Sequence, residues 1–495
     1  MADDSLRPEL AEVLARQAGL LDAARPGVVA KRRASGRQTA RENLAGLVDP
    51  GTWVEYGGLA VAAQRRRRSL KELVAATPAD GVIVGTGRVA GIRAAAVAYD
   101  YTVLAGTQGL TGHRKTDRLF VIAEREGLPV VVFAEGGGGR PGDTDHPTVA
   151  GLELMTFASL ARLRSLRVGI AAGFCFAGNA ALLGTCDVTI GVAGASVGMG
   201  GPAMIEAAGL GSVAPEDVGP LDVHTAAGVI DLEAADDAAA VRLAREVLSF
   251  TCADPVQATW ADQHQLREAI PENRRRAYDV RRLLRLLFDD GSVLELQARH
   301  GRACVTAFAR LTGHPVGVIA NNPMHLAGAI ETAVAVKAAR FLRLCDRIGL
   351  PVVSLCDTPG IMVGPAAERS GLVRAAGDLF SAGAALRTPI VTVVLRKAYG
   401  LGAMAMAGGS FHMSRLTVAW PTGEIGGMGL EGAVRLAFRK ELAAIADETQ
   451  RQRTEDDLVA HAYANGKALA AAAGFELDDV IDPADTRDRL TAALF

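Results

Sequence analysis

The sequence predicts an α/β fold of two tandem domains that derive from an internal duplication, and three observations lead to this prediction. First, two stretches share a sequence: EGLPVVVFAEGGG begins at Glu126 and IGLPVVSLCDTPG begins at Ile348, an offset of 222 residues. Second, the same offset carries Gly178 onto Gly400. Third, each copy alternates strand-like and helical patterns. Because the period is far too long for a solenoid repeat, a whole domain is duplicated.

The predicted elements follow the same order in both copies. Short apolar runs introduced by Gly-Leu-Pro, residues 129–135 and 351–357, are typical of buried strands. Before the second run, apolar residues spaced by three, four or seven positions predict a helix over residues 330–348. Each run leads into a glycine cluster, a helix and another apolar strand, residues 167–173 and 389–395. This order predicts helices layered on a mostly parallel sheet.

The duplication also predicts the domain boundaries. We expect an N-terminal domain over residues 1–255 and a C-terminal domain over residues 286–495. Residues 256–285 are rich in charge and helical in pattern, and we expect them to form a linker between the two copies.

Composition excludes several classes of protein. The 53 basic and 55 acidic residues give a net charge of −2, which argues against nucleic-acid binding, since phosphate affinity needs a positive field.

Residues 168–186 lack charges, but their counterpart contains an arginine and a lysine, so we expect no membrane span. The acidic N-terminus precedes no apolar stretch, and the six cysteines form no CxxC pair. We therefore expect a cytoplasmic protein with reduced cysteines and no bound metal.

Glycine clusters at the ends of strands are the main candidates for chemistry. They cover residues 135–140, 173–178, 357–360 and 399–403. Backbone N–H groups exposed at a glycine turn before a helix favour negative charge, either a phosphate or an oxyanion that develops on a carbonyl. The alternative is a tight turn that needs glycine only for its backbone conformation. Because established phosphate motifs and the GxSxG nucleophile motif are missing, chemistry by backbone dipoles remains.

A run of four arginines, Arg65 to Arg68, is followed by Lys71. Such a run is usually a solvated face or a flexible loop. The other interpretation is a clamp for the phosphates of an anionic cofactor tail.

The sequence resembles a known family over residues 40–439. The resemblance rests on ARENLAGLVDPGTWVEYGG and GTGRVAGIRAAAVAYDYTVLAGTQG in the first half, and on KAARFLRLCDRIGLPVVSLCDTPGIMVG, RKAYGLGAMAM and AWPTGEIGGMGLEGAV in the second. The family is that of the carboxyltransferase (β) subunits of biotin-dependent acyl-CoA carboxylases, of the propionyl-, methylcrotonyl- and geranyl-CoA type. It implies two crotonase-like domains built as ββα spirals. It also implies a homo-oligomer, a dimer up to a hexamer, with active sites between the first half of one chain and the second half of another.

The resemblance implies a mechanism and its residues. A carboxyl group passes from carboxybiotin, on a separate biotin carboxylase or carrier subunit, to the α- or vinylogous carbon of an acyl-CoA through an enolate. Backbone N–H groups then stabilise two oxyanions: those of Gly137 and Gly138 at the thioester, and those of Leu401 and Gly402 at biotin. Further residues implied are Gly106, Thr107, Gly173, Phe174, Gly178 and Met404 at the substrate, and Tyr399, Gly400 and Gly360 on the biotin side.

The sequence departs from the family at one position that lines its acyl pocket. The propionyl-type enzymes have aspartate where this chain has Met404. An apolar side chain there favours a longer or branched acyl group. No Ala-Met-Lys-Met biotinylation motif is present, so we expect biotin to arrive on another polypeptide.

Three other functions stay open. The same residues fit the carboxyltransferase of a biotin-dependent acyl-CoA decarboxylase, which runs the reaction in reverse. A crotonase-type hydratase would need a pair of carboxylates for acid–base work, and the sequence pairs none. A non-catalytic scaffold subunit would not need glycine clusters in both halves.

Overall fold

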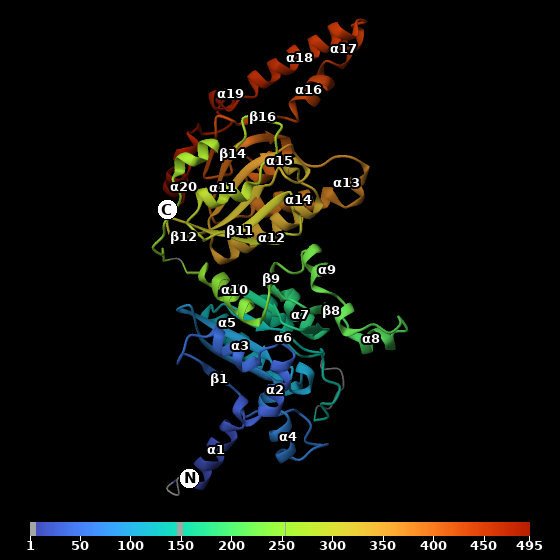
Figure 1. The fold of residues 1–495 in the computed structure, drawn as a ribbon, viewed down its shortest axis with the longest axis vertical. Coiled ribbons are helices and arrows are strands. Elements are labelled where there is room, and N and C mark those ends of the chain that lie inside the picture. The colour runs from blue at the N-terminus through green and yellow to red at the C-terminus, as the bar shows by residue number, and fades with distance from the viewer. Residues whose placement is uncertain (1–5, 146–151, 253) are drawn as a thin grey trace. The chain divides into compact units, whose positions relative to one another are not determined.

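Each copy of the predicted duplication folds as an α/β unit in the computed structural model, which describes residues 6–145, 152–252 and 254–495 (Figure 1). The chain divides into two units, residues 1–251 and 252–495.

The first unit is built on a seven-stranded sheet. Its antiparallel part joins β1, β2 and β3, and β4, β5, β7 and β9 then follow in parallel. A separate two-stranded pairing joins β6 and β8. The bounds are β1 (Val54–Tyr56), β2 (Val82–Val89), β3 (Ile92–Tyr99), β4 (Val130–Phe133), β5 (Arg167–Ala171), β6 (Phe174–Phe176), β7 (Val188–Val192), β8 (Ser196–Gly198) and β9 (Leu232–Ala234).

The second unit repeats this topology. Strands β10, β11 and β12 are antiparallel, and β13, β14, β15 and β17 continue in parallel, with β16 paired to the end of β14. The structure confirms the predicted α/β fold, and the repeated strand order is consistent with a duplication. The bounds are β10 (Leu294–Leu296), β11 (Cys304–Leu311), β12 (His314–Asn321), β13 (Val352–Thr358), β14 (Ile390–Tyr399), β15 (Leu416–Ala419), β16 (Glu424–Gly426) and β17 (Asp479–Val480).

The helices that precede the two central strands correspond as well. In the first unit α5 (Leu110–Glu126) ends at Gly127, and in the second α12 (Thr332–Ile348) ends at Gly349. Both glycines are left-handed, with φ of 64° and 76°, which is the conformation that terminates a helix most easily with glycine. The Gly-Leu-Pro motif therefore marks the point where each chain copy leaves a helix and enters a buried strand.

The other helices cover the two sheets or extend from them (Figure 1). In the first unit they are α1 (Pro8–Ala18), α2 (Pro26–Ala34), α3 (Ala40–Leu47), α4 (Leu70–Ala76), α6 (Thr156–Arg162), α7 (Gly178–Thr185), α8 (Pro202–Ala207), α9 (Leu221–Ala226) and α10 (Asp237–Ser249). In the second they are α11 (Val280–Leu287), α13 (Pro365–Arg369), α14 (Leu372–Ala384), α15 (Gly400–Met406), α16 (Leu430–Ala437), α17 (Arg439–Ala444), α18 (Glu448–Asn465), α19 (Ala468–Ala473) and α20 (Thr486–Leu494).

The predicted linker, residues 256–285, is instead an integral part of the second unit. Leu266, Ile270 and Tyr278 belong to the same buried core as the strands β11–β14. Arg267 forms an ion pair with Asp482, which stands just before the last helix. The apolar residues of the segment pack inward on this core, while Arg267 is exposed.

The uncharged segment 168–186 forms β5, β6 and the buried helix α7. In the parts of the chain that the structure describes, no helix has both the length and the apolar character needed to cross a membrane.

Candidate active site

The glycine loop of the first unit, residues 136–140, follows β4 and lies against three other segments. Gly136 donates its N–H to the Phe174 carbonyl at 2.7 Å, and the Gly138 carbonyl accepts from the N–H of Gln108 at 2.7 Å. A Cβ at Gly138 would stand 2.6 Å from the Cβ of Ala177, just before α7, and Gly138 has a φ of 89°. Only glycine fits this position, because both the space and the backbone conformation exclude a side chain.

Close approaches bring the predicted substrate-side residues of the first unit together. A Cβ at Gly106 would lie 2.5 Å from the Glu135 carbonyl oxygen, and one at Gly173 would lie 2.3 Å from a carboxylate oxygen of the same glutamate. A Cβ at Gly178 would lie 2.3 Å from the side-chain oxygen of Gln108. The arrangement places Gly106, Thr107, Gly173, Phe174 and Gly178 around the loop, whereas Met404 lies in the second unit.

Both predicted donors of the loop already have an acceptor within the protein. The Gly137 N–H donates to the Ala105 carbonyl at 3.1 Å, and the Gly138 N–H donates to Oδ1 of Asn179 at 3.0 Å, so neither points unused toward a ligand. Among the described residues, no acceptor lies within hydrogen-bond distance of the N–H groups of Gly139 and Gly178. Gly178 N is 3.5 Å from the place where a Gly138 Cβ would stand, so these two donors flank the same spot.

Arg140 fixes the end of this loop from within the protein. Its side chain is almost fully buried and forms an ion pair with Asp80, and it donates to the Thr107 carbonyl at 2.8 Å. Asp80 also accepts the Gly112 N–H at 2.6 Å and lies in a left-handed turn with Ala79. Arginine suits this position because its several donors bind a carboxylate and a carbonyl at once.

Lys115 also binds the left-handed turn that contains Ala79. Its ammonium donates to the carbonyls of Ala79 and Val82 at 2.7 and 2.6 Å. Burial lowers the pKa of Lys115 to about 8. The second unit repeats the device, since Lys337, 222 residues further on, donates to three carbonyls near the start of β11.

The corresponding site of the second unit lies where β14 runs into α15. A Cβ at Gly402 would stand 2.6 Å from the Cα of Gly360 and 3.0 Å from the nitrogen of Ile361. Gly400 has a φ of 53°, and its Cβ would meet the Gly427 carbonyl at 2.5 Å. The structure therefore brings together Gly360, Tyr399, Gly400, Leu401 and Gly402, all the residues predicted for the biotin side.

The first turn of α15 carries donors that the chain does not use. No acceptor for the N–H groups of Leu401 and Gly402 is present among residues 6–145, 152–252 and 254–495. The Ile361 N–H, at the equivalent position to that of Gly139, has no acceptor in this part of the chain either. In both units an unused N–H of the glycine loop thus accompanies an unused N–H at a helix start, which is the arrangement that stabilises an oxyanion.

The loops of the two units share their hydrogen bonds as well as their sequence offset. Ile330 donates to the Gly360 carbonyl at 3.0 Å, as Gln108 donates to that of Gly138. Met362 donates back to the Ile330 carbonyl at 2.9 Å, which repeats the bond between Arg140 and Gln108. The duplication therefore preserved a backbone framework, while the side chains on it diverged.

A buried carboxylate supports the second loop. Asp357 accepts hydrogen bonds from the Tyr278 hydroxyl at 2.9 Å and from Nε of Arg396 at 3.1 Å. Burial beside this carboxylate raises the pKa of the Tyr278 hydroxyl well above its usual value, so it stays a donor. Tyr399, directly before α15, donates to Glu424 at 2.9 Å, and burial likewise raises its pKa. The polar groups around this loop are therefore paired and fixed.

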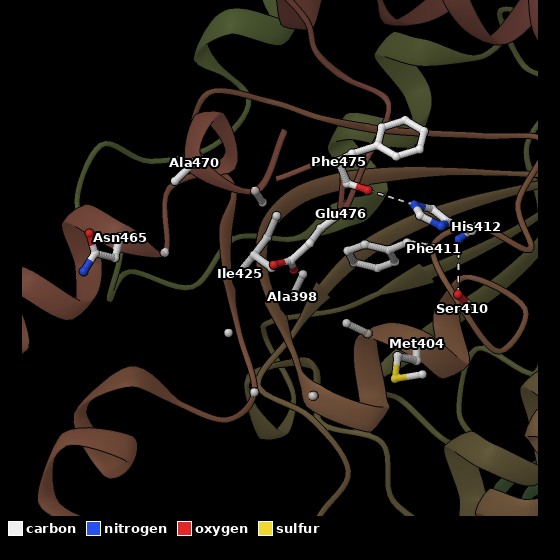
Figure 2. A pocket seen from close by; sticks show the side chains of 16 residues that line it. Ala398, Met404, Ser410, Phe411, His412, Ile425, Asn465, Ala470, Phe475 and Glu476 are labelled. Atoms are coloured by element: carbon white, nitrogen blue, oxygen red, sulfur yellow. Dashed lines mark hydrogen bonds between the residues drawn. The ribbon is translucent and has the colours of Figure 1, made fainter. Parts of the chain in front are cut away.

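An open pocket of about 520 Å³ in the second unit reaches from Gly400 along α15. Figure 2 shows side chains that line it. Met404, 39% exposed, lies one helical turn after Gly400 and lines it. Its walls also include Phe411, His412, Phe475, Glu476 and two alanines of α19, Ala470 and Ala471. The pocket therefore joins a candidate oxyanion site to a space lined by aromatic and aliphatic groups.

Sequence reasoning missed several residues that hold the two frameworks. Asn179, Asp80 and Tyr278 act through their side chains, each on a loop that is distant in sequence. Gln108 acts through its backbone N–H and carbonyl, and no local motif marks any of the four. No cluster of three histidine, cysteine or acidic side chains suited to a metal occurs in the residues that the structure describes.

Comparison with known proteins identifies the family of the chain. Residues 31–494 match the family model of the carboxyl transferase domain. The chain therefore belongs to the carboxyltransferase family of the biotin-dependent acyl-CoA carboxylases.

Individual relatives place it more closely. The chain is 34% identical to the methylmalonyl-CoA carboxyltransferase 12S subunit of Propionibacterium freudenreichii subsp. shermanii, over 94% of this chain and 90% of that protein. It is 33% identical to the biotin-dependent long chain acyl-coenzyme A carboxylase beta4 subunit of Mycobacterium tuberculosis, over 92% of this chain and 88% of that protein.

Two solved structures are similar throughout. A single-chain, multi-domain long-chain acyl-CoA carboxylase is 54% identical with a TM-score of 0.92; the match covers 99% of this chain and 49% of that one, so the chain spans about half its length. The transcarboxylase 12S hexamer, with methylmalonyl-CoA bound, is 31% identical with a TM-score of 0.86, over 98% of this chain and 94% of that one.

Proposed function

We propose that this chain transfers a carboxyl group from carboxybiotin to the α- or vinylogous carbon of an acyl-CoA. When bound, carboxybiotin supplies the carboxyl group, and its ureido nitrogen takes the proton that the acyl group loses. The observation that carries the proposal is the pair of matching backbone sites, each with N–H donors that have no acceptor among the described residues. The reaction needs two such sites because negative charge develops on a thioester oxygen and on a ureido oxygen.

The residues take the following roles in this proposal. The N–H groups of Gly139 and Gly178 hold the thioester oxygen as it becomes an enolate, in place of the donors first expected at Gly137 and Gly138. The N–H groups of Leu401 and Gly402 hold the ureido oxygen. Loss of one such donor typically costs about 2.7–4 kcal/mol of barrier.

The substrate we propose is an acyl-CoA longer than propionyl-CoA. Met404 presents an apolar side chain to the pocket beside α15, and an apolar wall favours a long acyl chain. A charged aspartate at this position would disfavour such a chain. The structural relative with 54% identity is a long-chain acyl-CoA carboxylase, which supports the same conclusion.

The carrier and the assembly belong to the proposal as well. We expect biotin to be presented by a carrier domain outside this sequence, since the sequence lacks a biotinylation motif. We expect a homo-oligomer, because the 12S relative forms a hexamer. A cytoplasmic location agrees with the six free cysteines of the structure.

The test is a direct transfer assay. The purified chain is mixed with a carboxylated biotin carrier and with acyl-CoAs from propionyl to palmitoyl, and mass spectrometry follows the carboxyl group. Transfer that increases with chain length supports the proposal. Transfer that occurs only from a malonyl-type thioester to biotin would assign a decarboxylase instead. No transfer in either direction would overturn the proposal and favour a scaffold subunit.

A further inference from the structure

The four arginines at residues 65–68 form an exposed turn between buried residues 62–64 and helix α4. Within the described parts of the chain, no carboxylate comes within ion-pair distance of their guanidinium groups. Hydrogen bonds from Ser69 and the nearby charge of Arg68 lower the pKa of Glu72. The turn therefore presents unneutralised positive charge on a protein whose net charge is −2.

The turn is fixed to the segment that follows the first glycine loop. The carboxylate of Asp145 accepts the N–H groups of Arg65 and Arg66 at 2.8 and 3.0 Å. In return, the Ala63 carbonyl accepts the N–H groups of Thr144 and Asp145, both at 3.0 Å. A flexible, solvated run would not be held by four hydrogen bonds to one segment, so the backbone under the arginines has a defined position.

This position is close to the proposed thioester site. A Cβ at Gly142 would lie 3.6 Å from Nη1 of Arg67 and 3.1 Å from the side-chain nitrogen of Gln64. Gly142 is three residues beyond Gly139, a distance that an extended chain spans in at most about 11 Å. Arg140, buried between them, keeps this stretch in place. The guanidinium groups are thus within one ligand length of the loop, without touching the reacting carbonyl.

The two acidic side chains of the same stretch bind other groups than these guanidinium groups. Asp143 accepts the Leu110 N–H at 2.8 Å and the Gln64 side chain at 3.1 Å. Asp145 is engaged by the backbone of the turn itself. Asp143 also pairs with Arg140 at 3.5 Å, so among the described residues neither carboxylate forms an ion pair with the guanidinium groups of the turn.

We propose that the arginine turn, residues 65–68, binds the phosphate groups of the acyl-CoA. This inference rests on the proposed function, which places the thioester at the loop of Gly139. Coenzyme A carries a diphosphate and a 3′-phosphate, and its pantetheine arm separates them from the thioester. Guanidinium groups bind phosphate through paired hydrogen bonds, and several on one turn match a ligand with several phosphates.

The experiment compares substrates that differ only at the phosphate end. The double variant Arg66→Gln/Arg67→Gln is assayed with an acyl-CoA, with the corresponding 3′-dephospho-CoA thioester and with the acyl-pantetheine thioester, which lacks all three phosphates. We expect KM for the acyl-CoA to rise about tenfold, because two charged contacts are lost, while KM for acyl-pantetheine stays unchanged. The matched control is Arg125→Gln/Arg242→Gln, which removes two exposed arginines of α5 and α10 and should change neither KM.

The dependence of the KM change on the substrate shows which group, if any, the arginine turn binds. A variant effect that disappears with the 3′-dephospho thioester assigns the contact to the 3′-phosphate, and one that persists assigns it to the diphosphate; both support the proposal. An equal rise for acyl-pantetheine would show that the turn only shapes the loop, and no rise for the acyl-CoA would exclude contact. A rise in KM for the biotin carrier alone would assign the turn to the carrier and overturn the proposal. If the wild-type chain transfers no carboxyl group to acyl-pantetheine or acyl-CoA, the proposed function itself has failed.

Discussion

Replacement of Gly402 by alanine tests whether the backbone donors of α15 perform the chemistry. The new Cβ would stand 2.6 Å from the Cα of Gly360 and 2.7 Å from its carbonyl carbon. Ordinary contacts between carbon atoms are about 3.5–4.0 Å, so the helix start and the loop must separate by about 1 Å. Both atoms belong to backbone, and no side chain can rotate away to relieve the overlap. A displacement of about 1 Å at reacting groups can cost about 100-fold in rate.

The expected result is a loss of about 100-fold in kcat, because the separation displaces the N–H donors of α15. Alanine is a better helix former than glycine by about 1 kcal/mol, which offsets part of the strain, so thermal unfolding should shift only slightly. The assay measures carboxyl transfer from methylmalonyl-CoA or a longer homologue to free biotin, together with a melting curve.

Gly377→Ala provides the matched control. Gly377 also lies within a helix of the second unit, α14, and its Cβ would meet nothing within 4 Å. This variant should keep full activity. If Gly402→Ala retains activity within about threefold of the wild type while folded, the donors of α15 are not the catalytic groups, and the reasoning is refuted.

Four further predictions follow from the same structure. Gly138→Ala should reduce kcat about 100-fold, since its Cβ would overlap a neighbouring Cβ at 2.6 Å; a variant with normal turnover would contradict this. Met404→Asp should shift the preference toward short acyl-CoAs in a chain-length series, and an unchanged preference would show that this side chain does not line the acyl site. Tyr278→Phe should lower the free energy of unfolding by about 1–2 kcal/mol in urea titrations, because Asp357 loses a buried donor; no change would mean that residues 256–285 do not brace the loop. Lys115 is protonated more easily in the unfolded chain, where its pKa is 10.5, than in the folded protein, where it is about 8. Between these pH values the unfolded state binds more protons, so stability relative to Lys115→Met should rise with pH by up to about 3 kcal/mol, and a flat difference would refute the shift.

Much of the fold could be predicted because the duplication is visible in the sequence. Gly127 and Gly349 mark equivalent helix ends, and the apolar runs after them are strands β4 and β13 in the structure. Glycine clusters at strand ends also located both candidate sites. These features are local: a glycine turn and a buried strand each leave a mark within a few residues.

The donors themselves could not be predicted in the same way. Whether the Gly138 N–H is used depends on Asn179, which lies 41 residues further along the chain. The role of residues 256–285 depends on Tyr278 reaching Asp357 across 79 residues. Contacts of this kind follow from the packing of distant elements, and a single sequence records the side chains without recording which of them meet.

The close contact between Gly402 and Gly360 has a consequence for how such proteins diversify. Because the reacting groups proposed here are peptide N–H groups, every residue type other than proline supplies them, and mutation of a side chain cannot delete them directly. Selection must instead preserve the close approach of two backbone segments, the start of α15 and the loop at Gly360. Glycine makes this approach possible because it has no Cβ. Side chains along the neighbouring pocket, Met404 among them, are then free to change. A lineage can therefore acquire new acyl substrates while its chemistry stays intact.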